Sequence, residues 1–296
     1  MDWNRLKVFH AVAEAGSFTH AGETLNLSQS AISRQISALE GELRTSLFHR
    51  HARGLSLTEQ GESLYRTAHE VSAKLAMTEA VLGEAREHPT GKLKVTTPVG
   101  FGSTWLTPRI GEFLELYPEV NVDLVLDDRL LDLSMREADI AIRMQPPTQA
   151  DLVQRHLMTV HNHLYASPAY LKRNGTPRNL ADLLAHKLIT YGEDAPPPVV
   201  EINWLQKAGR EQGLQLTPVL TVNNIYGLLL AVENDVGIAS LPDYMIADHP
   251  QFIRVLPDVE APSFDTLLVY PDELRKTKKI SIFRDFLLAK VAGWSF

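Results

Sequence analysis

The first forty residues alternate apolar and polar positions with the period of short amphipathic helices. One segment covers residues 3–15 and precedes Gly16, a residue that commonly ends a helix. A second segment covers residues 18–25. Their apolar positions are Leu6, Phe9, Ala13, Phe18, Ala21 and Leu25. The pattern predicts two helices separated by a tight turn.

A third helix is predicted after Ser28, whose side-chain oxygen can cap its first turn. Its apolar positions recur every three or four residues, and we expect all of them to be buried: Ile32, Ile36, Leu39 and Leu43. The opposite face carries hydrogen-bonding side chains and one cation: Gln29, Ser30, Ser33, Arg34 and Ser37. Such a helix can enter the major groove and contact base edges.

Residues 47–57 read as two short extended pieces around Gly54, the pattern of a wing, with Arg50 and Arg53 facing the DNA backbone or minor groove. A long helix is then predicted over residues 59–89. Its apolar seam follows a heptad spacing: Leu64, Ala68, Val71, Leu75, Thr78, Leu82 and Ala85. Because a narrow seam on a long helix needs a partner, we expect dimerisation through this helix.

From residue 92 the chain alternates strands and helices, which is typical of a parallel sheet with helices on its faces. The predicted strands cover residues 93–97, 120–126, 138–144, 187–190, 216–222, 237–241 and 266–270. The predicted helices cover residues 105–116, 130–137, 180–184, 225–234 and 280–291.

The N-terminal motifs resemble the DNA-binding domain of LysR-type transcriptional regulators. The resemblance is carried by residues 6–19, 27–36 and 47–50, by Arg53, and by residues 57–61. It implies that Gln29, Ser30, Ser33 and Arg34 contact bases and phosphates, and that Arg50 and Arg53 are wing contacts. Ser30 and Ser37 could equally be solvated positions.

The resemblance implies a multidomain α+β and α/β fold. A winged helix-turn-helix domain would cover residues 1–58 and a linker helix residues 59–89. A two-lobed effector domain, similar to periplasmic binding proteins, would cover residues 90–296. Lobe I would take about 90–162 and 268–296, and lobe II about 163–267, with hinge strands at 160–165 and 266–270.

A small organic effector is expected beyond the carboxyl ends of the parallel strands. The loop after the first strand leads into a helix, whose free N–H groups favour an anion. Candidate contacts are Pro98, Val99, Gly100, Phe101, Gly102, Ser103, Arg143, Asn203 and Asn224. By resemblance, the lack of Ser or Thr at positions 99 and 100 disfavours a small carboxylate, and Phe101 could form an aromatic wall. Arg143 could instead be a surface residue, and Asn224 a plain N-cap.

The 296-residue chain has no cysteine, which excludes disulfides, thiol redox sensing and cysteine-based zinc or iron–sulfur sites. Its net charge is −7. Residues 1–57 carry six Lys/Arg against five Asp/Glu, so placement rather than net charge must supply the phosphate-binding surface. No apolar run suits a membrane span, and residues 1–15 lack a signal-peptide pattern, so we expect a cytoplasmic protein.

No catalytic constellation, cofactor motif or metal motif is predicted, although sites made of histidines are not excluded. His161 and His163 have a spacing that could place both imidazoles on one face of a strand, whereas His49 and His51 are expected to belong to the wing. The expected function is therefore an effector-responsive transcriptional regulator. The expected partners are double-stranded DNA with an interrupted inverted repeat, further copies of the chain as a dimer or dimer of dimers, and the effector, with RNA polymerase left open. A transport-type binding protein and an α/β enzyme with an accessory module are the alternatives.

Overall fold

The computed structural model describes residues 2–51, 54–82, 89–147, 149, 151–192 and 197–293. It forms two compact units, one built on residues up to Leu82 and the other on residues 89–133 and 137–293. Among the described helices, none combines the length and apolar character that crossing a membrane requires.

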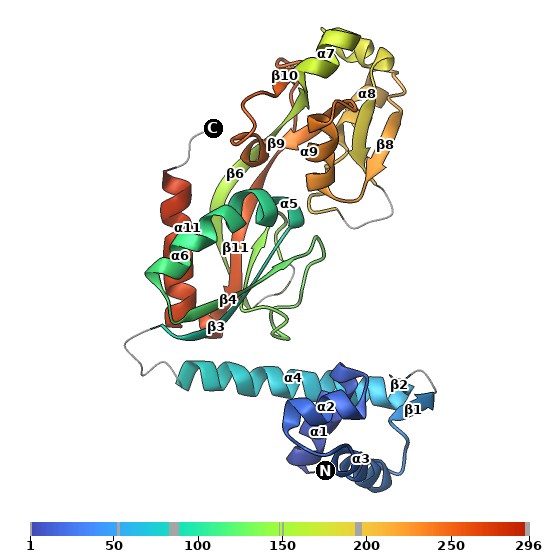
Figure 1. The fold of residues 1–296 in the computed structure, drawn as a ribbon, viewed down its shortest axis with the longest axis vertical. Coiled ribbons are helices and arrows are strands. Elements are labelled where there is room, and N and C mark those ends of the chain that lie inside the picture. Colours follow the sequence, from blue (N-terminus) through green and yellow to red (C-terminus); the bar gives the residue numbers. More distant parts are fainter. Residues whose placement is uncertain are drawn as a thin grey trace. The chain divides into compact units, whose positions relative to one another are not determined.

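The N-terminal unit is a winged helix-turn-helix (Figure 1). The first three helices have side-chain N-caps, of which Ser28 was predicted. Asp2, Ser17 and Ser28 each accept a backbone N–H of the helix that follows them. The elements are α1 (Trp3–Ala15), α2 (Phe18–Leu25), α3 (Gln29–Leu43), β1 (Phe48–His51), β2 (Gly54–Leu57) and α4 (Glu59–Leu82).

The core of this unit packs the apolar stripes of the first three helices against the wing. Its buried side chains include Phe9, Val12, Ala21, Ile32, Ile36, Leu39, Leu47 and Phe48. The prediction that Leu43 is buried is wrong, because its side chain is 38% exposed. It occupies the last position of α3, where Arg44 turns into the left-handed region and ends the helix.

Helix α4 begins after Thr58, whose hydroxyl accepts the N–H of Gly61. Ala68 is fully buried against the N-terminal core, whereas Val71 and Leu75 are 37% and 45% exposed. The apolar seam of α4 is therefore packed against the N-terminal core at Ala68 and exposed to solvent at Val71 and Leu75. Ala85 and the predicted end of the helix lie outside the described residues.

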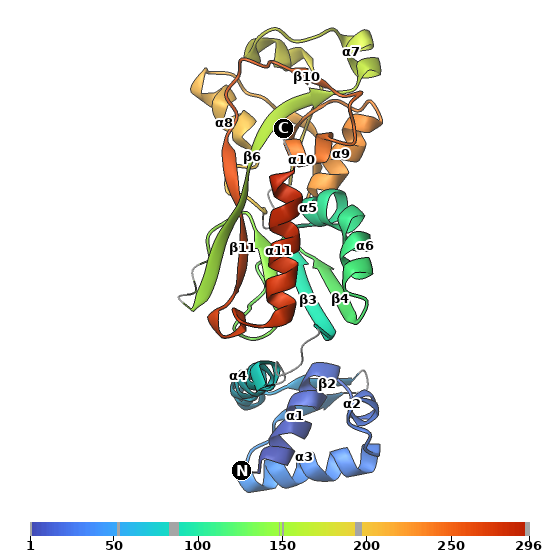
Figure 2. The ribbon, with the colours of Figure 1, turned by 90° about the vertical axis from the view of Figure 1, so that its left-hand side faces the viewer.

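The second unit is built on one nine-stranded sheet, in the order β4-β3-β5-β11-β6-β9-β7-β8, with β10 paired to β6. In its first part, lobe I, β3 pairs in parallel with β4 and β5, and β11 is antiparallel to β5. Phe113 on α6 packs against Phe283 and Phe286 on α11. The two helices lie side by side in Figure 2. The elements are β3 (Gly91–Thr97), α5 (Val99–Phe101), the π-helical segment η2 (Gly102–Leu106), α6 (Thr107–Leu116), β4 (Val120–Leu126), β5 (Ile140–Arg143), η4 (Asp272–Leu274) and α11 (Lys278–Ala292).

Two lobe I predictions need correction. The helix predicted over 105–116 is the end of a longer helical segment that starts at Val99 and includes π-helical turns. The helix predicted over 130–137 is a series of turns. The Arg143 side chain donates to the carbonyl of Leu131, a group that a helix would bond internally, and Arg136 lies in the left-handed region at φ 55°.

Lobe II contains β7, β8 and β9, which pair in parallel, and a core around Tyr170, Leu183 and Trp204. Four of its elements were not predicted: α7, α8, α10 and β10. The elements are α7 (Pro168–Asn174), η3 (Leu180–Ala185), β7 (Leu188–Tyr191), α8 (Trp204–Glu211), β8 (Pro218–Val222), α9 (Ile225–Glu233), β9 (Ile238–Pro242), α10 (Asp243–Ile246) and β10 (Ile253–Val255).

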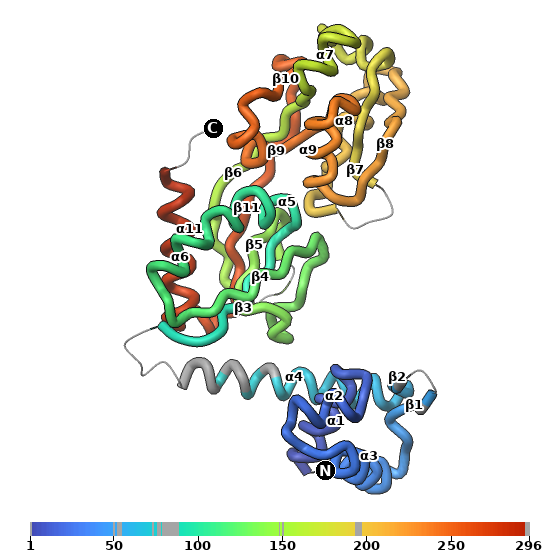
Figure 3. The backbone as a smooth tube through the Cα atoms, in the orientation of Figure 1, coloured from blue at the N-terminus to red at the C-terminus, as the bar shows by residue number. Residues whose placement is uncertain are grey.

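Two long strands, β6 (Leu152–Ala166) and β11 (Ser263–Pro271), connect the lobes. They pair with each other from Leu152↔Pro271 to His161↔Ser263. Beyond that point β6 pairs with β9 and β10 (Figure 3). The crossing strands predicted at 160–165 and 266–270 are therefore parts of a longer ribbon.

Candidate DNA-binding surface and effector cleft

The outer face of α3 is polar and open. Gln29, Ser30 and Arg34 are exposed, and Ser33 is half-buried. Ser30 shares a hydrogen bond with the capping Ser28 at 3.1 Å between their hydroxyl oxygens. Within the described residues, the Arg34 guanidinium forms no ion pair. Because Ile32 and Ile36 fix the inner face in the core, the helix presents these polar groups in a set orientation.

The turn between α2 and α3 depends on Gly22. A Cβ at this position would lie 2.6 Å from the carbonyl oxygen of Leu27, closer than a side chain allows. Asn26 follows in the left-handed region at φ 54° and ends α2. The glycine lets the backbone of the turn pass against α2, and so sets the position from which α3 begins.

The wing is a two-stranded antiparallel ribbon in which Phe48 pairs with Leu57 and His51 with Gly54. His49 and His51 are exposed, with their rings 6.0 Å apart. The backbone of Arg50 lies in β1. The Arg50 side chain and all of Arg53 fall outside the described residues, so their predicted contacts stay predictions.

The wing is fastened to α3 and α4 by hydrogen bonds. The Glu40 carboxylate accepts the N–H of Leu47 at 2.7 Å, and the Thr58 hydroxyl donates to the carbonyl of Ser46 at 2.8 Å. The Thr58 N–H donates to the carbonyl of Leu47 at 3.0 Å. These hydrogen bonds therefore fix the position of the two-stranded wing relative to α3.

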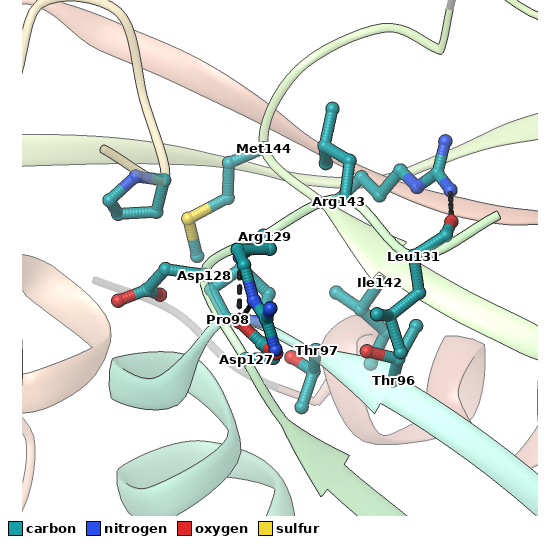
Figure 4. Close-up of a pocket in the computed structure, with 12 residues that line it drawn as sticks. Thr96, Thr97, Pro98, Asp127, Asp128, Arg129, Leu131, Ile142, Arg143 and Met144 are labelled. Atoms are coloured by element: carbon teal, nitrogen blue, oxygen red, sulfur yellow. Dashed lines mark hydrogen bonds and ion pairs between the residues drawn. The ribbon is translucent and has the colours of Figure 1, made fainter. Parts of the chain in front are cut away.

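In the second unit, a small cleft that is open to solvent lies at the carboxyl ends of β3, β4 and β5 (Figure 4). Pro98 and Arg143 are the two predicted effector contacts that line it. Pro198 comes from lobe II. The other lining residues are Thr96, Thr97, Asp127, Asp128, Arg129, Leu130, Leu131, Ile142 and Met144.

An internal carboxylate occupies the anion position predicted at the start of α5. Asp128 accepts the Val99 N–H at 3.0 Å, and its second oxygen accepts the Tyr191 hydroxyl at 3.3 Å. Burial raises the pKa of Asp128, against the lowering effect of these two hydrogen bonds. Burial and the neighbouring Asp128 raise the pKa of Tyr191 to about 12. Since Tyr191 lies on β7, this carboxylate also joins lobe I to lobe II.

The other charged groups of the cleft are bonded to the protein as well. Arg129 binds both carboxylate oxygens of Asp127, and these bonds lower the pKa of Asp127. Arg143 is 5% exposed and donates to the carbonyl of Leu131 at 2.6 Å. Burial lowers the pKa of Arg143, and the charge of Asp132 opposes this effect. Figure 4 shows both arginines turned to these partners.

Several predicted effector residues support the cleft without lining it. Phe101 is fully buried, stacked on Trp105 with ring centroids 4.8 Å apart, so its ring belongs to the core and is not a wall of the cleft. Gly100 and Gly102 are also buried, whereas Val99 and Ser103 are half-buried. A Cβ on Gly100 would lie 2.1 Å from the Ile225 side chain, so this glycine permits α5 to contact α9.

The two predicted asparagines cap and brace backbone in lobe II. Asn203 accepts the N–H of Tyr191 at 3.1 Å and donates to its carbonyl at 2.9 Å. It lines a second, small hollow beside β7 and α9. Asn224 is the N-cap of α9 and accepts the N–H groups of Tyr226 and Gly227. The plain N-cap alternative for Asn224 describes its contacts in this structure.

Comparison with known proteins decides the family. Residues 3–62 match the bacterial regulatory helix-turn-helix protein of the lysR family, and residues 86–292 match the LysR substrate binding domain. The chain belongs to the LysR family. It is therefore a DNA-binding transcriptional regulator with an effector-binding domain, and not an enzyme.

Similar LysR-type proteins span almost the whole chain. An HTH-type transcriptional regulator of Xanthomonas campestris pv. campestris is 30% identical over 294 residues, covering 98% of this chain and 86% of that protein. The CrgA regulator of Neisseria meningitidis has a solved structure that is 26% identical, with a TM-score of 0.61 and coverage of 99% and 100%. The structure of CbnR with its target DNA shares the fold at 20% identity, a TM-score of 0.64 and coverage of 98% and 100%.

The sequence reasoning missed Asp128, which lines the cleft, and Tyr191, whose hydroxyl bonds to Asp128 from the other lobe. The sequence did contain a pattern from which Asp128 could have been predicted. The rule that ligands gather beyond the carboxyl ends of parallel strands was applied to β3, but it applies equally to β4, which ends at Leu126 directly before Asp127 and Asp128. No comparable signal marks Tyr191, which comes from the other lobe.

Proposed function

We propose that this LysR-type regulator binds an interrupted inverted repeat, with α3 of each subunit in the major groove. The observation that carries the proposal is the outer face of α3, which is polar and open while its inner face is fixed in the core. Gln29, Ser30, Ser33 and Arg34 are the proposed base and phosphate contacts. Arg50 and Arg53 are the proposed wing contacts.

We propose that the binding species is a dimer or a dimer of dimers, paired through α4. Val71 and Leu75 lie four residues apart on α4 and leave more than a third of each side chain exposed. A second α4 would cover them, since two apolar seams can bury each other. Two subunits then present two recognition helices, which matches the two halves of an inverted repeat.

The effector is proposed to be a small organic molecule bound in the cleft at Asp128. An effector that takes the Val99 N–H must displace the Asp128 carboxylate, and so must also break the bond from Tyr191 of the other lobe. Gln145 adds a second link, donating to the carbonyls of Pro197 and Pro198. We infer that the effector changes the closure of the lobes, and thereby the spacing or bend of bound DNA.

Capture of sheared genomic DNA from the source organism by the purified full chain tests the DNA proposal. The expected result is a small set of enriched sites that share an interrupted inverted repeat, with the protein dimeric or tetrameric in solution. Absence of enrichment from folded dimeric protein would contradict it. We propose that the regulator acts in the cytoplasm, where the DNA is, and transcription assays on such sites would test a contact with RNA polymerase.

The effector proposal is tested on the captured operator. Candidate metabolites suggested by the neighbouring genes are added while the DNA footprint and bend are measured. A ligand that changes either one, and whose binding is altered in an Asp128→Asn variant but not in an Asp248→Asn variant at an exposed site of lobe II, supports the proposed cleft. A ligand that binds both variants alike would place the effector elsewhere.

A further inference from the structure

An imidazole–carboxylate–imidazole cluster joins α1 to α4 in the DNA-binding unit. His10 and Glu14 lie one turn apart on α1, and His69 approaches from α4. His10 Nε2 lies 2.8 Å from His69 Nδ1. Glu14 Oε1 lies 3.7 Å from the His10 nitrogen and 3.8 Å from the His69 nitrogen. Neither the DNA-reading face nor the effector cleft uses these three groups.

The three atoms nearly form one face of a tetrahedral metal site. Zinc binds imidazole nitrogen at about 2.0–2.1 Å and carboxylate oxygen at about 2.0–2.2 Å, so two ligands of a tetrahedral ion lie roughly 3.3 Å apart. The separation between the two histidine nitrogens is shorter than that value, and the two separations from the Glu14 oxygen are longer. Each separation must change by about half an ångström to admit an ion, a movement that small rotations about the side-chain bonds can supply.

Packing on one aromatic ring orients both imidazoles. The ring of His10 stacks on Tyr65 at 5.5 Å between centroids, and the ring of His69 lies 5.5 Å from the same Tyr65 ring. This packing places the two histidine rings from different helices beside each other, with one nitrogen of each directed at the other.

The cluster is reachable from solvent. The side chain of Glu14 is 51% exposed, whereas those of His10 and His69 are 13% and 21% exposed. An ion can therefore enter from the Glu14 side, and a water molecule can take the fourth position. Two imidazoles and one carboxylate suit zinc, whereas magnesium and calcium prefer oxygen ligands alone.

We propose that His10, Glu14 and His69 bind one zinc ion per chain and clamp the start of α4 to α1. The ion would cross-link the helix proposed to pair the subunits to the body of the winged helix-turn-helix domain. Zinc would then make the connection between the winged helix-turn-helix domain and α4 more rigid, and with it the position of α3 relative to the second subunit.

Titration of the metal-free full chain with Zn²⁺ tests the proposal, with the affinity measured by competition against a chromophoric chelator. We expect one tight ion per chain, and loss of affinity by more than about tenfold in His69→Gln and in Glu14→Gln. Glu14→Gln changes the most exposed ligand and so guards against misfolding as the cause. Replacing Zn²⁺ with Co²⁺ should give the visible absorption of a tetrahedral nitrogen–oxygen site.

Two matched controls separate this site from other histidines. His20→Gln alters an exposed histidine of the same unit. His163→Gln alters one of the two histidines, His161 and His163, that contact Asp243 in lobe II. Both variants should keep the tight ion. No binding by the wild type, equal binding by all four variants, or loss confined to His163→Gln would overturn the proposal.

Discussion

The reading face of α3 and the effector cleft are both polar, but their charged groups are bonded differently. Arg34 on α3 is exposed and, among the residues that the structure describes, forms no ion pair. In the cleft, Arg129 is held by Asp127, Arg143 by the carbonyl of Leu131, and Asp128 by Val99 and Tyr191.

This difference bears on how each region binds its partner. Polar groups that face water lose only hydration when DNA replaces it, so the reading face needs no internal rearrangement. Groups that are already bonded inside a cleft must exchange partners when a ligand arrives. Under the proposed function, the outer face of α3 is therefore ready before DNA binds, whereas an effector bound in this cleft would have to change the protein.

The largest expected effect comes from the buried side of α3. Ile36→Ala should lower the free energy of unfolding by about 2–5 kcal/mol, because it leaves a cavity in a fully buried site. Urea unfolding of the full chain measures this. The neighbouring Ser37→Ala, on the exposed side, should change stability by less than about 0.5 kcal/mol. Similar losses in both variants would contradict the two-sided description of α3.

The exposed side of α3 should affect DNA binding without affecting stability. Arg34→Ala should weaken binding to the captured operator by about 1–3 kcal/mol, since a base contact of arginine has that magnitude. Fluorescence anisotropy with specific and random duplexes measures it. Arg210→Ala, an exposed arginine of lobe II, is the matched control. Equal weakening on both duplexes would limit Arg34 to a phosphate contact.

A smaller effect is expected from the bond across the cleft. Tyr191→Phe removes the hydroxyl that donates to Asp128, which should cost about 0.5–1.5 kcal/mol in unfolding free energy. The same variant should make the lobes easier to open and raise the rate of amide hydrogen exchange in β7. Unchanged exchange in β7 would show that this bond does not hold the lobes together.

The smallest expected effect is a change in the pH dependence of stability. Because the folded protein binds the Asp128 proton more tightly than the unfolded chain, protonation of Asp128 adds stability at low pH. That contribution is lost as the pH rises from the usual carboxyl pKa through the raised pKa. The stability of Asp128→Asn relative to wild type should therefore increase over this window and level off above it. Unfolding curves at a series of pH values test this, and a flat difference would contradict it.

The sequence predicted most of the DNA-binding unit because its helices are specified locally. Each has one apolar stripe and a capping residue such as Ser17 or Ser28, and their bounds agree with the structure. The error at Leu43 arose where the helix ends, since periodicity does not reveal which residue is last. Most strands of the second unit were also predicted from their β-branched runs, apart from β10 and the first part of β6.

The cleft was less predictable because its contacts join residues far apart in the chain. Periodicity cannot show that Asp128 fills the anion position at Val99, or that Tyr191 reaches it from another lobe. The helix predicted over 130–137 failed for the same reason, since the Arg143 side chain takes a carbonyl of that segment. Phe101 looked available beside glycines, but Trp105 covers it.

The pairing of β6 with β11 has a consequence for synthesis on the ribosome. Lobe I begins with β3 at Gly91, yet it needs β11 and α11, which end at Ala292. The strands that complete lobe II, β7 to β10, emerge before β11. Although domains usually fold in the order of synthesis, the first lobe to begin is the last to be completed. A nascent chain halted after Leu256 should therefore lack β11, which lies between β5 and β6 in the complete sheet. Lobe I would then be incomplete.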